Sequence, residues 1–375
     1  MSFAFEGKHG GNAVHDRADE EATAFQFYGS WREYAPIAFT NLLLILVTLG
    51  FYRFWATTRA RKYLWGNTRF IDDRLEWTGT GKELMTGFIL AILLFALPLA
   101  LLNWGVQALM LRGMAGPAFL LLLLLYASFM YVTGLARFRA LRYRLSRTYW
   151  HGIRGGSDDG GWSYGFSAIW KTLIGFIPLW LLVPWSMASL WNERWRKMSY
   201  GPHAFRSEAR AMPIFKVFLL FYLSPILLVI LTIGLVGTAG GFIGDVFVRT
   251  NAPPLIAILM MLVIFAGVYM LLGVIALAYY AAYLRECISK LELGTIGFEF
   301  EATTSDWLNL FIVDMLLVIG TLGVGWIFLS YRHWKFFITH LEATGEIDLG
   351  MLTQSQTREL KQGEGLLDAF DVGAF

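Results

Sequence analysis

Four polar side chains stand inside otherwise apolar stretches of this 375-residue chain: Asn41, Asn103, Gln107 and Asp314. A polar or ionisable group within such a stretch is costly unless it is partnered, so these residues are candidates for binding a substrate or relaying a proton. The alternative for Asn41 and Asp314 is that they hydrogen-bond backbone loosened by nearby helix breaks. Both interpretations are carried forward.

Patterns typical of an enzyme are scarce. His333 and His340 are seven positions apart and could share a helix face, but no carboxylate joins them at a spacing suited to zinc. The glycine clusters at 152–161 and 237–241 lack the Lys-Ser/Thr ending of a phosphate-binding loop, and no GxSxG motif occurs. The single cysteine, Cys287, excludes an intrachain disulfide. We therefore predict no catalytic residue, no metal and no cofactor.

Basic side chains gather in segments that are also rich in Trp and Tyr. Aromatic residues of this kind favour the headgroup level of a bilayer, and each basic side chain there gains roughly 1 kcal/mol from anionic lipid. Because these segments lie in short loops between apolar stretches, where the positive-inside rule accounts for basic residues, we expect lipid rather than nucleic acid as the partner. The segments either anchor the chain or bind lipid headgroups or anions, and the candidates are Arg59, Arg61, Lys62, Arg147, Arg154, Arg196 and Lys197.

The composition is that of a membrane protein. The chain is 56% hydrophobic and 16% charged, with a mean hydropathy of +0.52, whereas soluble domains carry about 25% charged residues. Crossing a bilayer takes about 20 apolar residues. We predict an all-α polytopic membrane protein without a cleavable signal peptide, with long spans at about 84–110, 117–136, 214–240 and 254–284.

Self-comparison indicates an internal repeat. An offset of 273 residues places Phe25-Gln26-Phe27 on Phe298-Glu299-Phe300 and pairs Asn41 with Asp314, and an offset of 135 places Arg61 on Arg196. Each unit combines an apolar helix interrupted by Gly or Pro with a basic aromatic segment and, in the full units, two spans. The predicted organisation is a flexible tail (1–24), unit 1 (25–160), unit 2 (161–297), a half unit (298–342) and an acidic tail (343–375).

The interrupted helices, at about 34–52, 168–191 and 307–331, decide the topology. If they cross the membrane, successive units are inverted, which is a known transporter plan. If they are re-entrant or interfacial, the basic segments all share the cytoplasmic side, as the positive-inside rule favours. Short cytoplasmic strands are expected at Thr68–Thr78 and Phe298–Thr303.

Several motifs together resemble the YjgN family of bacterial inner-membrane proteins. They are Phe27-Tyr28-Gly29-Ser30, Asn41-Leu42-Leu43, Thr48-Leu49-Gly50-Phe51-Tyr52, Arg61-Lys62-Tyr63, Gly152-Ile153-Arg154 and Pro184-Trp185. His151 departs from the family pattern, which leads us to expect arginine there. The resemblance implies a bacterial inner-membrane location and supplies no substrate, cofactor or catalytic residue.

Three function classes follow. A small-molecule or ion transporter is indicated by the repeat, the broken helices and the polar pair, and requires a cavity reaching Asn41 and Asp314. A scaffold or envelope-homeostasis protein requires no cavity and a protein partner for the acidic tail. A lipid-modifying enzyme requires convergence of residues such as Asp72, His151 and Asp158. The oligomeric state is left open.

Overall fold

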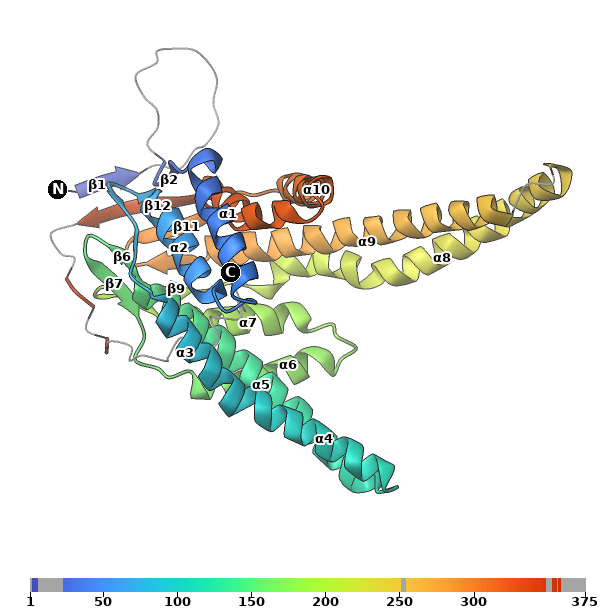
Figure 1. Ribbon diagram of the computed structural model, residues 1–375, viewed down its shortest axis with the longest axis horizontal. Coiled ribbons are helices and arrows are strands. Elements are labelled where there is room, and N and C mark those ends of the chain that lie inside the picture. Colours follow the sequence, from blue (N-terminus) through green and yellow to red (C-terminus); the bar gives the residue numbers. More distant parts are fainter. Residues whose placement is uncertain (1, 6–22, 251–253, 349–352, 356, 359–375) are drawn as a thin grey trace, which may run out of the picture.

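Strands gather at one end of the molecule, and helices of different lengths project from them (Figure 1). The computed structural model describes residues 2–5, 23–250, 254–348, 353–355 and 357–358. Nine strands form one sheet in the order β1 (Ser2–Phe5), β12 (Leu341–Asp348), β11 (Ile296–Phe300), β10 (Leu291–Leu293), β9 (His203–Ser207), β8 (Ser199–Tyr200), β7 (Ile153–Gly156), β6 (Thr148–Trp150) and β5 (Glu76–Trp77). A second sheet contains β2 (Phe25–Phe27), β3 (Thr68–Phe70) and β4 (Asp73–Arg74).

The connections from β5 to β12 alternate between helical hairpins and tight turns. All neighbouring strands in this series pair antiparallel. The tight turns β6–β7, β8–β9 and β10–β11 use positive-φ glycines, at Gly152, Gly201 and Gly294, where a side chain would be strained. Because successive connections in an antiparallel sheet lie at opposite ends of the strands, each helical hairpin between β5 and β12 leaves from the same end of the strands.

Two of the hairpins are long and apolar. One consists of α3 (Gly81–Ala91), a π-helical turn η1 (Ile92–Ala96), α4 (Leu97–Leu111) and α5 (Ala115–Arg147), and the other of α8 (Ala211–Thr250) and α9 (Pro254–Ser289). Pro98 lacks an N–H group and crowds the carbonyl four residues earlier, which accounts for the π turn. Among the residues that the structure describes, four stretches are long and apolar enough to cross a membrane: Gly81–Leu111, Ala115–Arg147, Ala211–Ile230 and Phe265–Ser289. The predicted spans 84–110 and 117–136 fall within the first two stretches, whereas the predicted spans 214–240 and 254–284 overlap the last two in part and fall within α8 and α9.

Three shorter hairpins replace the predicted interrupted helices. They are α1 (Trp31–Val47) with α2 (Arg53–Gly66), α6 (Trp162–Phe176) with α7 (Val183–Arg196), and α10 (Thr304–Gly320) with the 3-10 turn η2 (Val324–Phe328) and α11 (Leu329–Thr339). The strands that flank each hairpin pair with each other: β2 with β3, β7 with β8, and β11 with β12. Each short hairpin therefore begins and ends at the same sheet.

The first and third hairpins pack together at their roots, although they are far apart in the sequence. The Tyr34 and Tyr331 rings stack at 5.5 Å, and those of Trp65 and Trp334 at 3.9 Å. Tyr331 Oη donates to the Gly29 carbonyl at 2.9 Å. In the second hairpin, α6 packs against α5 and α7 against α8, so this hairpin lies between the two long ones (Figure 1).

The prediction of an all-α protein is wrong in one respect, because the helices are attached to a large sheet. Most of its strands have two to five residues, and partners such as β7 and β8 are separated in sequence by a whole helical hairpin. Residues 2–5 of the predicted N-terminal tail and 343–348 of the predicted acidic tail pair as strands β1 and β12. Residues 6–22 and 359–375 lie outside the described residues.

Candidate functional site

Each short hairpin turns at a leucine with left-handed backbone. Leu49, Leu179 and Leu322 have φ values of 50°, 51° and 51°. These residues are 93%, 74% and 94% exposed. Leaving so much leucine surface in contact with water is unfavourable. A set of exposed leucines at matching tips indicates insertion into an apolar medium.

A buried polar residue lies eight positions before each of these leucines. Asn41, Lys171 and Asp314 are 7%, 8% and 6% exposed, and each contacts the returning helix of its own hairpin. Eight helical residues span about 12 Å, so all three side chains lie at a similar distance from the tip. The positions differ in chemistry: an amide, an ammonium and a carboxylate.

Asp314 has the strongest set of partners of the three. Arg332 Nε lies 2.5 Å from Asp314 Oδ1, and His333 Nε2 lies 2.7 Å from Asp314 Oδ2. The carboxylate is only 8% exposed, whereas Arg332 and His333 are 28% and 42% exposed. A buried carboxylate is thus linked to a titratable imidazole at the surface of the hairpin.

Asn41 is less well satisfied. Its Nδ2 donates to the Ala56 carbonyl at 3.3 Å, but its buried Oδ1 accepts no hydrogen bond from the residues that the structure describes. This contact to the returning helix agrees with the interpretation in which polar groups hydrogen-bond backbone near a break. Asn41 and Asp314 each bond within their own hairpin, and neither lines the polar pockets described below.

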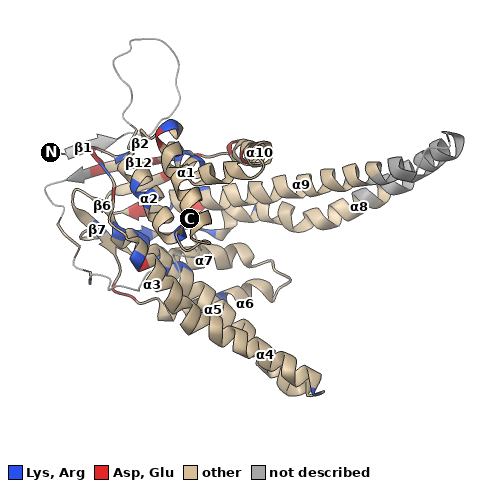
Figure 2. Ribbon diagram, in the orientation of Figure 1, with Lys and Arg blue, Asp and Glu red and all other residues tan. Residues whose placement is uncertain are grey.

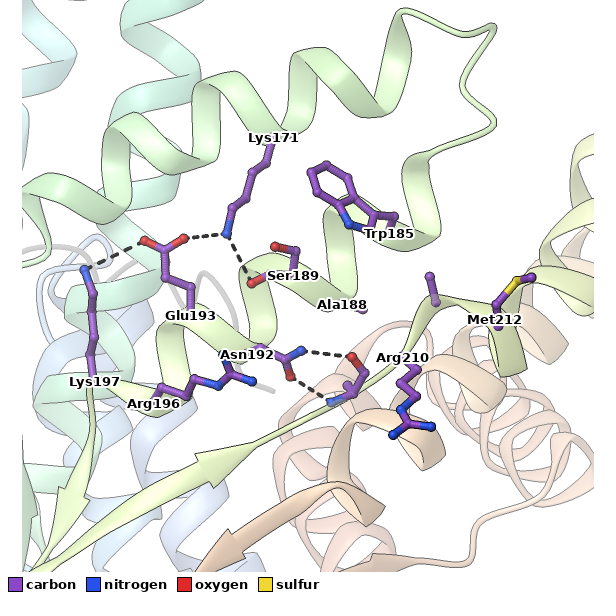
Figure 3. Close-up of a pocket in the computed structure, with 12 residues that line it drawn as sticks. Lys171, Trp185, Ala188, Ser189, Asn192, Glu193, Arg196, Lys197, Arg210 and Met212 are labelled. Carbon is purple, nitrogen blue, oxygen red and sulfur yellow. Dashed lines mark hydrogen bonds and ion pairs between the residues drawn. The ribbon is translucent and has the colours of Figure 1, made fainter.

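Lys171 forms the wall of a pocket of about 850 Å³ between the second short hairpin and the root of α8. Figure 3 shows Lys171 of α6 pointing toward Glu193 and Ser189 of α7. Its Nζ lies 2.6 Å from Glu193 Oε2 and 3.4 Å from the Ser189 carbonyl oxygen. The remaining lining residues are Trp185, Ala188, Asn192, Arg196, Lys197, Ala209, Arg210, Ala211 and Met212.

Cations outnumber acids in this pocket, because Lys171, Arg196, Lys197 and Arg210 face Glu193 alone. Lys197 is partly neutralised from outside, since its Nζ lies 2.9 Å from Asp159 Oδ2. Burial acts to raise the pKa of Asp159, but hydrogen bonds from Lys197 and the Gly161 N–H outweigh it and hold that pKa below its ordinary value. The loop before α6 therefore contributes a fixed negative charge beside the pocket.

A second polar pocket, of about 600 Å³, lies between α10 and α11. Its lining includes Asp306, Arg332, Lys335 and His340, and Trp31 at the start of α1 closes one side. Thr303 caps α10 in a capping box with Asp306. The Asp306 carboxylate accepts from the Thr303 hydroxyl and N–H, and these bonds lower the pKa of Asp306. The charges in this pocket are more nearly balanced than those beside Lys171.

The predicted basic residues have diverse surroundings. Arg59 and Lys62 are exposed on α2, while Arg61 is buried with its guanidinium 4.9 Å from the Trp77 ring. Arg147 forms an ion pair with Glu83 at 3.0 Å. Of the predicted set, the structure brings only Arg196 and Lys197 into one pocket.

Arg154 is occupied by the chain itself. It is 5% exposed, and its guanidinium donates to the carbonyl and hydroxyl of Thr357. Gln354 Oε1 accepts from the Arg154 N–H, and Asp158 Oδ1 accepts from the Arg358 N–H. Residues 353–355 and 357–358 of the predicted acidic tail are therefore docked beside β7.

The remaining candidates are the polar pair on α4 and the residues considered for a lipid-modifying enzyme. Asn103 and Gln107 are exposed on α4 and line none of the pockets described above. Of the triad considered for a lipid-modifying enzyme, His151 and Asp72 meet at 2.8 Å, whereas Asp158 binds the C-terminal segment. Within the described residues, no group of three His, Cys, Asp or Glu is placed to hold a metal ion.

Sequence reasoning missed Lys171, Glu193 and Arg210. Lys171 was overlooked because it immediately precedes the charge-free run that begins at Thr172. An offset of 130 residues, rather than 135, aligns Leu49 with Leu179 and pairs Asn41 with Lys171. Counting back from the turn would have identified it.

The protein-family model DUF898, described as a bacterial protein of unknown function, matches residues 22–369. The chain belongs to this family. Curated relatives of the DUF898 chain are named inner membrane protein YjgN, which confirms the resemblance to the YjgN family. The Salmonella typhimurium protein is 28% identical over 94 residues, covering 25% of this chain and 24% of its own length. The Escherichia coli K12 protein is 26% identical over 141 residues, covering 38% and 32%.

These matches place the DUF898 chain among multi-pass inner-membrane proteins, in agreement with its four apolar helical segments. The matched stretches span about a quarter to a third of the length of these curated relatives. No solved structure matches the chain.

Proposed function

We propose that this protein is a membrane-embedded platform that holds its β-sheet against the cytoplasmic leaflet and binds anionic lipid headgroups there. The observation that carries the proposal is the common origin of the helical hairpins between β5 and β12 at one end of the strands, with the α1–α2 hairpin packed against the last of them. Three hairpins are too short to be paired spans and have exposed apolar tips, while two are long enough to cross. In this arrangement the long hairpins cross the membrane and the short hairpins insert into it partway, and both anchor the sheet.

Charge supports the cytoplasmic placement of the sheet. Figure 2 shows Lys and Arg gathered around the strands and the helix roots, with the projecting helices almost free of charge. The described tip of the first long hairpin carries only Arg112. Under the positive-inside rule the sheet, the hairpin roots and the C-terminal segment lie in the cytoplasm. This orientation corresponds to the parallel arrangement of the units, and the repeat itself stays a prediction that the recurring hairpins support.

The long hairpins diverge from each other and leave the second short hairpin between their roots (Figure 1). In each spanning stretch, at most 22% of the residues in the most apolar window are buried within the chain. Their side chains therefore face lipid or another chain. This geometry favours a platform over a solute path through a single copy of the chain.

Lipid retention tests the proposal. The purified protein is placed in nanodiscs of equal phosphatidylglycerol and phosphatidylcholine content, extracted with mild detergent and weighed by native mass spectrometry. Preferential retention of phosphatidylglycerol is expected, because the basic residues lie at headgroup level. Equal retention of the two lipids would contradict the proposal.

A transporter is the second candidate, and one observation favours it. Asp314 is a buried carboxylate bridged to Arg332 and to the half-exposed His333, and ionisable groups at membrane depth mark proton paths. Proteoliposomes with a trapped pH-sensitive dye would then equilibrate a proton gradient faster than empty liposomes, and Asp314→Asn would abolish the difference. Equal rates for protein-containing and empty liposomes would reject proton transport.

A further inference from the structure

The pocket beside Lys171 is apolar at one end and cationic at the other. Trp185, near the start of α7, and Lys197, which follows its last residue, are separated by twelve residues, or about 18 Å of helix. Figure 3 shows Trp185 and Met212 at one end of the pocket and Arg196 and Lys197 at the other, with Lys171 and Arg210 between them. Met212 is 78% exposed, so the apolar end is open to the surroundings of the helices.

The cations in this pocket are not equally free to bind a ligand. Lys171 is bound to Glu193, and Lys197 is shared between Asp159, Glu193 and the Ser163 hydroxyl. The Arg196 Nε donates to the Ser207 carbonyl at 2.8 Å, which fixes the side chain and leaves its two terminal amino groups.

Arg210 is held by its backbone N–H, which donates to Glu286 Oε1 at 3.0 Å. Neither Arg196 nor Arg210 forms an ion pair with a carboxylate in the part of the chain that the structure describes. Figure 3 shows both arginines on the side of the pocket opposite Lys171. The Arg196 guanidinium is held through its Nε, whereas Arg210 is fixed only at its backbone. Guanidinium groups are suited to a phosphate, whose oxygens accept paired N–H donors.

We propose that this pocket binds one anionic phospholipid, with the headgroup phosphate held by Arg196 and Arg210 and an acyl chain lying along Trp185 and Met212. The proposal rests on the proposed function and assigns its lipid to a single site. The Lys171–Glu193 ion pair lines the middle of the pocket and adds no net charge to it. A soluble phosphate would use the arginines but not the apolar end.

The test measures binding of short-chain dihexanoyl phosphatidylglycerol to delipidated protein in a non-ionic detergent. Competitors are sn-glycerol 1-phosphate, which lacks the tails, and dihexanoyl phosphatidylcholine, which lacks net charge. The variants are Arg196→Gln and Arg210→Gln. Arg206→Gln is the matched control, because Arg206 is exposed on β9 and does not line the pocket.

We expect each pocket variant to weaken phosphatidylglycerol binding about fivefold, from roughly one headgroup contact per arginine, and Arg206→Gln to leave it unchanged. Equal affinity for glycerol phosphate would overturn the assignment to a lipid, and equal affinity for phosphatidylcholine would overturn the preference for an anionic headgroup. If the wild type prefers phosphatidylglycerol in nanodiscs but all three variants bind alike, the site is wrong while the platform function stands.

Discussion

Replacing the polar residue of the third hairpin, Asp314→Asn, is expected to destabilise the protein far more than Asn41→Ala in the first hairpin. Asp314 accepts from Arg332 and His333, and hydrogen bonds to charged groups contribute about 1.5–3 kcal/mol each. Asparagine keeps one acceptor, and both partners are partly exposed to solvent. We therefore expect a loss of about 2 kcal/mol in the free energy of unfolding.

Asn41→Ala has two opposing effects. It removes one neutral hydrogen bond, to the Ala56 carbonyl, which contributes about 1 kcal/mol. It also removes a buried Oδ1 that has no donor among the described residues, and burying such an acceptor costs about 1–3 kcal/mol. The two terms offset each other, so the net change should lie within about 1 kcal/mol of zero.

Thermal unfolding in detergent at pH 7.5, followed by tryptophan fluorescence, compares the two variants. At roughly 2 °C per kcal/mol for a large chain, Asp314→Asn should lower the Tm by about 4 °C and Asn41→Ala by less than about 2 °C. Adding Arg332→Gln to Asp314→Asn should recover part of the loss, because it removes the charge left unpaired. Equal shifts for Asp314→Asn and Asn41→Ala, or additive losses in the double variant, would refute the reasoning.

Two further predictions concern residues beside the sheet. The pKa of Asp159 is held below its ordinary value of 3.8. The contribution of this carboxylate to stability is therefore present above pH 3.8 and is lost as the pH falls through the lower, folded-state pKa. Asp159→Asn should lower the Tm at pH 7, and the difference in Tm between variant and wild type should disappear in acid. Arg154→Met removes the donors that hold Thr357, so trypsin should cut after Arg358 several-fold faster than in the wild type. Mass spectrometry of the shortened chain measures the cleavage rate. An unchanged rate would show that other contacts hold the segment.

The sequence allowed the spans to be predicted because charge-free runs of that length have no place in a soluble fold. Two short hairpins begin at side-chain caps that the sequence analysis did not use: Ser30 accepts from the Glu33 N–H, and Thr303 forms a capping box with Asp306. The offset of 273 residues pairs Asn41 with Asp314, and both side chains are buried. Hydropathy and helix-capping patterns can be recognised in the sequence without knowledge of the fold.

The sheet and the lipid pocket depended on contacts between distant segments. Strand β7 has the sequence Ile-Arg-Gly-Gly and is buried throughout, so it shows no alternation of polar and apolar residues. Arg154 was a candidate for an external anion because nothing local predicts that Thr357, some 200 residues later, satisfies it. Lys171 was missed because a five-residue difference in offset displaced the second hairpin from the first.

Labelling of single cysteines from the two sides of the membrane tests the central claim most directly, namely that every hairpin leaves from and returns to a sheet on the cytoplasmic side. In a Cys287→Ala background, cysteines at Asp73, Ala204 and Ala115, all exposed positions, are treated with an impermeant maleimide in right-side-out and inverted inner-membrane vesicles. The account predicts labelling of Asp73→Cys and Ala204→Cys only in inverted vesicles, and of Ala115→Cys only in right-side-out vesicles. Labelling of Asp73→Cys and Ala204→Cys from opposite sides would contradict it.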